Sequence, residues 1–162
     1  LLFVGINPGL WTAATQTHFA YPGNRFYPAL KLAGIIEREI DRGVGMSDED
    51  RRHLLDRGIG ITNVAHRATA KASELSRQEL IAGGEILRAF VRTHQPQVVA
   101  VAGVTAYRTA FAEPKAVMGE HPDGFEGRRL WIVPNPSGLN AHETVETLAE
   151  AYAAPARAAG VI

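Results

Sequence analysis

The sequence predicts an α/β fold in which a central, mostly parallel sheet of four to five strands lies between layers of helices. Short apolar runs alternate along the chain with longer segments of helical periodicity, as in strand–helix–strand units. These apolar runs are continuous, which is typical of strands covered on both faces. The chain has 162 residues with no repeat or linker, so we expect residues 1–162 to form a single domain.

The first half of the chain holds two predicted strands and two predicted helices. Leu1–Ile6 is a continuous apolar run and therefore a predicted buried strand, and a long loop rich in Gly, Pro and Thr follows over Asn7–Asn24. Asn24 is a predicted N-cap, because its side chain can accept a hydrogen bond from the first turn of a helix. Ser47–Asp50 is an acidic segment that would offset the helix dipole at the start of a second helix. Ile59–Val64 is the second predicted strand.

The second half repeats this alternation. Ser76 and Glu79 have the spacing of a capping box, so a long helix is predicted to begin there. Its buried side is expected to carry Leu80, Ile81, Leu87, Phe90 and Val91. A strand, a helix and a further strand follow over Gln97–Ala102, Val104–Phe111 and Leu130–Pro134. Asn140 with Glu143 has the spacing of another cap, which predicts the start of the closing helix.

Composition excludes several classes of site. There is no cysteine, which excludes disulfides, thiolate zinc sites, cysteine-ligated iron–sulfur clusters and a cysteine nucleophile. The 17 basic residues balance the 17 acidic ones, so a nucleic-acid partner would have to bind through a local patch. The six histidines show no metal-binding spacing, and no apolar run is long enough to cross a membrane. We therefore expect no metal and no membrane partner.

Two Asn-Pro motifs follow apolar strands and mark the candidate site. Asn7-Pro8-Gly9 comes after the first predicted strand, and Asn135-Pro136-Ser137-Gly138 comes after the last one. One such motif alone is most simply a strand-exit turn. Two of them at strand ends indicate a site, because ligands bind at the carboxyl ends of the strands in open α/β sheets. An asparagine side chain is no general base at neutral pH, but its carbonyl oxygen can orient a water molecule.

Three further features each have a structural and a functional interpretation. Phe19 and Tyr21 would either anchor the long loop to the core or stack on a nucleobase. Leu139 would be either an ordinary hydrophobic contact at a helix entrance or an apolar wedge inserted between bases. Asp56 would be either a helix-end carboxylate or an ionised group in the reaction. It precedes its strand, on the side away from the expected ligand edge.

In their order and spacing, five segments resemble the mismatch-specific uracil-DNA glycosylase and thymine-DNA glycosylase family. They are Gly5–Leu10, Phe19–Phe26, Gly58–Asn63, Ser76–Gly84 and Pro134–Leu139. The resemblance covers nearly the whole chain. It implies a small three-layer α/β fold of the uracil-DNA glycosylase kind.

The resemblance also implies residue roles. Asn7 would be the catalytic residue that holds the attacking water against C1′. Asp56 is a second catalytic candidate on chemical grounds and not from the resemblance, because a nearby carboxylate would stabilise the cationic sugar better. The residues implied to form the base pocket are Ile6, Gly9, Thr12, Phe19 and Asn135. The implied DNA wedge, which fills the space left by a flipped base, is Gly138, Leu139 and Asn140. Some relatives place a basic residue in the segment that is Asn140-Ala141-His142 here, and Trp11 and Asn63 would reshape the pocket.

The implied activity is excision of uracil, or of a related damaged or mispaired pyrimidine, from mismatched double-stranded DNA. The base would be flipped out and its N-glycosidic bond hydrolysed, leaving an abasic site. No cofactor is implied, and one subunit is enough. A purely hydrolytic glycosylase is expected, because neither Asn-Pro motif contains a lysine that could form a Schiff base.

Two other functions stay open at this point. Without a strong base, the chain would be a catalytically weak module that binds mismatched or single-stranded DNA. A nucleoside hydrolase would use the same pocket but has no use for a duplex wedge. The chain begins abruptly inside a strand, as expected of a fragment lacking an upstream segment, so targeting is not defined by the sequence. A bacterial protein of this kind is expected in the cytoplasm, associated with the nucleoid.

Overall fold

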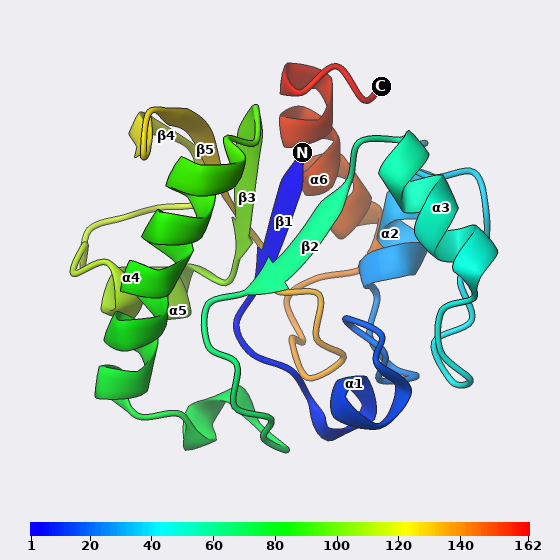
Figure 1. Cartoon of the computed structure of the whole chain (residues 1–162), viewed down its shortest axis with the longest axis horizontal. Coiled ribbons are helices and arrows are strands. Elements are labelled where there is room, and N and C mark those ends of the chain that lie inside the picture. Colours follow the sequence, from blue (N-terminus) through cyan, green and yellow to red (C-terminus); the bar gives the residue numbers. More distant parts are fainter.

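The strands form one sheet in the order β2-β1-β3-β5-β4 in the computed structural model, which describes residues 1–162 (Figure 1). The parallel strands are β1 (Leu2–Gly5), β2 (Gly60–Asn63), β3 (Val98–Ala102) and β5 (Arg128–Val133). An antiparallel edge strand, β4 (Gly119–Phe125), pairs with β5. The predicted fold class, a mostly parallel sheet between helices, is confirmed.

Helices cover both faces of the sheet. One layer contains α2 (Phe26–Leu32), α3 (Asp48–Asp56) and α6 (Val145–Ala158), and the other contains α4 (Arg77–His94) and α5 (Val104–Ala110). Two short elements, α1 (Leu10–Thr15) and the 3₁₀ helix η1 (Ala72–Glu74), lie beyond the carboxyl ends of the strands (Figure 1). No helix has the length and apolar character needed to cross a membrane.

Strand β1 shows why its sequence is apolar at every position. The fully buried Phe3 packs in the core shared with α2 and α6, whereas Leu2 and Val4 pack in the core shared with α4 and α5. Successive strand residues point to opposite faces, so a strand covered on both sides has no polar alternation. Burying each of these large side chains stabilises the fold by about 1.5–3 kcal/mol. The parallel strands therefore hold their carboxyl ends in fixed positions at one edge.

The capping box predicted at the start of α4 is present. The Ser76 side chain accepts from the backbone N–H of Glu79, and the Glu79 carboxylate accepts in return from that of Ser76. The acidic segment predicted to begin a helix does begin α3, where Ser47 and Asp50 form a further capping box. Both helix starts could be predicted because the signals involve residues only three positions apart.

Several predicted details are wrong. The segment predicted as a continuous loop contains α1, and β4 was not predicted because its exposed sequence is polar and includes Pro122, which an edge strand tolerates. Asn140 does not cap the closing helix, since Thr144 is its N-cap. Asn24 lies one residue before the N-cap position of α2, although its side chain does accept from the N–H of Phe26.

The buried side of α4 is also narrower than predicted. Leu87 and Val91 are buried and Leu80 packs against the same core. Ile81 and Phe90 are exposed, because the helix contacts the sheet along a single stripe.

Candidate active site

A cavity of about 430 Å³ lies at the carboxyl edge of the sheet, a size typical of small-ligand sites. Each parallel strand contributes to it at or directly beyond its end. Ile6 and Asn7 follow β1, Asn63 ends β2, Ala102 ends β3 and Asn135 follows β5. The sheet topology thus brings together side chains that are more than a hundred residues apart in the chain, as in other open α/β proteins.

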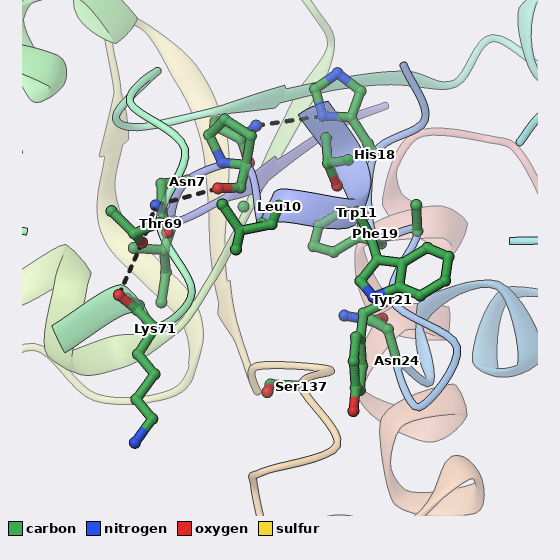
Figure 2. A pocket seen from close by; sticks show the side chains of 18 of the residues that line it. Asn7, Leu10, Trp11, His18, Phe19, Tyr21, Asn24, Thr69, Lys71 and Ser137 are labelled. Carbon is green, nitrogen blue, oxygen red and sulfur yellow. Dashed lines mark hydrogen bonds between the residues drawn. The ribbon is translucent and has the colours of Figure 1, made fainter. Parts of the chain in front are cut away.

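The side chain of Asn7 is held in one orientation. Its Nδ2 donates to Thr69 Oγ1 at 2.7 Å (Figure 2). It also donates to the Arg67 carbonyl oxygen at 2.9 Å and to the Pro8 carbonyl oxygen at 3.3 Å. A backbone carbonyl can only accept, so the amide nitrogen must face these groups. The Oδ1 atom has no hydrogen-bond partner in the chain and stays free to accept from a ligand or a water molecule.

Thr69 connects Asn7 to the backbone behind it. The threonine is buried, and its hydroxyl donates to the Lys71 carbonyl oxygen at 2.8 Å (Figure 2). Its one proton is used in that bond, so the hydroxyl can only accept a hydrogen bond from Asn7. The Asn7 atom that faces Thr69 must therefore be the donor Nδ2. The backbone N–H of Thr69 also donates to the Pro8 carbonyl oxygen at 3.2 Å. The 67–71 segment consequently holds the turn that follows β1.

If the site catalyses the uracil excision that the sequence resemblance implies, replacing Thr69 by valine is expected to slow that reaction about tenfold, the effect of losing one hydrogen bond of ordinary strength. Valine has nearly the same shape, but it cannot accept from Asn7. Thr69→Ser keeps the hydroxyl and should retain most of the rate. Single-turnover excision from a uracil-containing duplex measures both variants. A valine variant as fast as the original protein would show that this bond does not position Asn7.

The aromatic side of the cavity lies opposite Asn7 (Figure 2). The ring of Phe19 stacks on the fully buried ring of Phe26, with centroids 4.1 Å apart and planes 28° apart. Phe19 also has a left-handed backbone conformation, with φ of 55°, which costs energy for a bulky residue. Phe19 therefore both anchors its loop and lines the cavity, while Trp11 and Tyr21 are exposed near the cavity mouth.

Asn63 and His18 form a polar pair in the cavity wall. Asn63 is buried, and its Nδ2 lies 3.2 Å from Nδ1 of His18. Burial lowers the pKa of His18, and the nearby His66 and Arg51 lower it further. The ring is therefore neutral at neutral pH, and Nδ1 can accept from the amide. A Cβ on Gly5 would lie 2.5 Å from Asn63 Oδ1 and 3.0 Å from the Phe19 ring, so any larger residue there would displace these two side chains of the cavity wall.

The loop between β5 and α6 forms the remaining wall. Asn135 Oδ1 accepts from the Ser137 N–H at 3.0 Å, and Asn140 Nδ2 donates to the Asn135 carbonyl oxygen at 3.0 Å. At the tip of this loop the Leu139 side chain is 80% exposed. A large apolar residue this exposed at a cavity mouth is not explained by packing, so the helix-entrance interpretation of Leu139 is not supported by its contacts.

The cavity brings together most residues predicted for the site. They are Ile6, Asn7, Gly9, Thr12, Phe19, Asn135, Gly138 and Leu139. Asn140 does not line the cavity but bonds to the wall, as described above. His18 and Thr69 were not predicted; His18 adjoins Phe19 in sequence, whereas nothing in the sequence marks Thr69.

Asp56 does not reach the cavity. It is the exposed last residue of α3 and precedes β2, at the edge of the sheet opposite the site. Asp56 is therefore not placed to supply a carboxylate to the cavity, because a residue before a parallel strand lies at the opposite end of it from the site.

The cavity is lined by few charged side chains. No Asp or Glu lines it, and its one side chain with a permanent charge is that of Lys71. No group of three or more His, Asp or Glu side chains is placed to hold a metal ion. The site can orient water and stack on a planar ligand, but it offers no carboxylate as a general base.

Together, the strand order and the cavity define an α/β protein whose ligand site lies where the strand order reverses, at β1 and β3. The family model of the Uracil DNA glycosylase superfamily matches residues 1–155, and the chain belongs to this superfamily. Members of the superfamily are DNA glycosylases, hydrolases that act on DNA in repair. The resemblance carried by the sequence motifs is thus confirmed at the level of the superfamily.

Proposed function

We propose that this chain excises uracil, and related damaged or mispaired pyrimidines, from mismatched double-stranded DNA by hydrolysis alone. The observation that supports this most directly is the free Oδ1 atom of Asn7. Its orientation is fixed by the three hydrogen bonds that Nδ2 of the same side chain donates. An extruded base would enter the cavity and stack on Phe19. Oδ1 would then accept a hydrogen bond from a water molecule facing C1′ of the same nucleotide.

The chemistry of the bond suits a site without a carboxylate. The bond between C1′ and N1 breaks with its electron pair leaving on uracil, and the sugar becomes oxocarbenium-like. The water oxygen then bonds to C1′ and releases a proton to solvent, leaving an abasic site. Uracil leaves as a stabilised anion, so the reaction needs positioning of water more than proton abstraction. A mismatch lowers the cost of extruding the base and would supply part of the selectivity.

Excision from labelled duplexes with a single U·G, T·G, U·A or C·G pair tests this function. A chelator is present throughout, and alkali reveals abasic sites. Cleavage at U·G above that at U·A and C·G supports mismatch-directed excision, whereas equal excision from U·G and U·A contradicts the mismatch preference. Strand breakage before alkali treatment would reveal a lyase step and contradict the purely hydrolytic mechanism. A lyase step needs an amine that can form a Schiff base with the sugar. Neither Asn-Pro motif contains a lysine, but Lys71 lines the cavity and could supply that amine.

A DNA-binding module is the second candidate, and the lack of any carboxylate in the cavity favours it. A gel shift on the U·G duplex without excision at any pair would support that function. The third candidate, a nucleoside hydrolase, is tested by offering free uridine as the substrate in place of duplex DNA. Release of the base from free uridine at a rate similar to that from duplex would support this third function.

Leu139→Ala is expected to reduce excision from a U·G duplex roughly tenfold, because an inserted side chain compensates part of the cost of unstacking. Excision from single-stranded DNA should change little, since no stacked base has to be replaced. Val117→Ala is the matched control, because Val117 is also an exposed apolar side chain but does not line the cavity. Equal loss on the two substrates would contradict the wedge role.

A further inference from the structure

The loop at 135–143 is held from behind by one side chain, that of Arg25. Its Nη2 donates to the carbonyl oxygens of Ser137 at 2.6 Å and Asn140 at 2.7 Å, and its Nη1 donates to that of Glu143. The backbone N–H of Arg25 donates to the Pro136 carbonyl oxygen at 3.0 Å. Arg25 thus bonds four carbonyl groups along the loop that carries Leu139.

These bonds determine which way the loop amides face. In a trans peptide the C=O of one residue and the N–H of the next point in opposite directions. Because the carbonyls of Ser137 and Asn140 point inward to Arg25, the N–H groups of Gly138 and Ala141 point away from it. Both residues are exposed, and neither N–H has a hydrogen-bond partner in the chain.

The charge of Arg25 favours an anion on the outer side of the loop. The guanidinium bonds only neutral carbonyl groups and forms no ion pair, and its Nε is buried without a partner. A positive charge behind the peptide groups polarises them further and makes their outward N–H groups better donors. Backbone N–H groups that face outward without an internal partner are common ligands of phosphate oxygens in proteins.

We propose that Arg25 is a positioning residue that presents the Gly138 and Ala141 N–H groups to a backbone phosphate of duplex DNA. This inference rests on the proposed function, because it assigns a DNA contact to the loop beside the cavity. Arg25 itself does not contact the DNA. It keeps the amides and Leu139 in place, so that the phosphate contact and the insertion of the leucine occur together.

The test compares Arg25→Gln with Arg57→Gln. Arg57 also bonds three backbone carbonyls, those of Ile35, Gly34 and Val161, but none of them belongs to the loop at 135–143. The Arg25 variant is expected to raise KM for a U·G duplex about tenfold or more, the effect of losing charged hydrogen bonds. Its excision rate from a short uracil-containing single strand should stay within about twofold, with Arg25→Lys intermediate on duplex. The Arg57 variant should leave KM for the duplex unchanged.

Two further measurements separate positioning from direct contact and from simple loss of folding. The first is the slope of the logarithm of the duplex-binding constant against the logarithm of the salt concentration. If Arg25 bound a phosphate itself, Arg25→Gln would reduce the magnitude of this slope by about one. For a positioning residue the slope should stay unchanged. The amide resonances of Gly138 and Ala141 should shift when an abasic duplex is added to the original protein and shift much less in Arg25→Gln.

Three results would overturn the inference: equal loss of excision on duplex and single strand, a reduced salt slope, or unshifted Gly138 and Ala141 amides in the original protein. Failure of the proposed function is distinguishable, because it appears as no excision by the original protein. The amide shifts on added duplex would still report whether the loop binds DNA.

Discussion

Replacement of Asn7 by alanine is expected to lower the single-turnover rate of uracil excision by about 10²–10³-fold, the usual cost of removing one preorganised polar group from a reaction site. The reason is geometric. The Nδ2 atom is occupied by Thr69 and by the Arg67 and Pro8 carbonyl groups, so Oδ1 is the one atom of this side chain left for water. No carboxylate in the cavity is available to replace it.

Binding of the Asn7 variant to a U·G duplex should change by less than about threefold, because Phe19 and the loop at Leu139 are not altered. Single-turnover rates and a gel-shift titration measure the two effects separately. Gln97→Ala removes an exposed amide just before β3, at the other edge of the sheet, and should leave both quantities unchanged. An Asn7 variant that excises uracil at the original rate would remove this residue from the mechanism.

Gly83→Ala is expected to lower the free energy of unfolding by about 2 kcal/mol, as overpacking at a rigid contact does. A Cβ at this position would lie 2.1 Å from the carbonyl oxygen of Val64, which belongs to the backbone just beyond β2. Helix propensity alone predicts the opposite, a gain of about 1 kcal/mol for alanine in the interior of α4. The steric term wins because backbone cannot rotate away as a side chain can.

The neighbouring Ala82→Gly is the matched control. Ala82 is exposed, so only propensity acts, and the expected loss is about 1 kcal/mol. Urea denaturation with linear extrapolation measures both variants. If Gly83→Ala stabilised the protein, the contact between α4 and the segment after β2 would have to be looser than the structure shows. Any accompanying loss of excision would arise because this backbone leads into the 67–71 segment that holds Asn7.

Much of the fold was predictable because its signals are local. Phe3 and its neighbours form a continuous apolar run, Ser76 begins a capping box that needs only a residue three positions on, and the acidic residues after Ser47 mark the first turn of α3. Strand β4 was missed because an exposed edge strand buries little and so carries no apolar pattern. Asn140 was misassigned as a helix cap because its oxygen instead accepts from the N–H of His142 within the loop.

The sequence by itself determined the order of the four parallel strands and of the five longer helices. It also determined the motifs at the ends of β1 and β5, and thereby many of the residues that line the cavity. Each of these follows from neighbouring residues, since periodicity, capping and turn chemistry act over a few positions. Only the tertiary structure decided which polar groups share the site. Thr69 orients Asn7 across 62 residues and Arg25 holds Asn140 across 115. The same packing excluded Asp56, because the direction of β2 places that carboxylate at the opposite edge of the sheet.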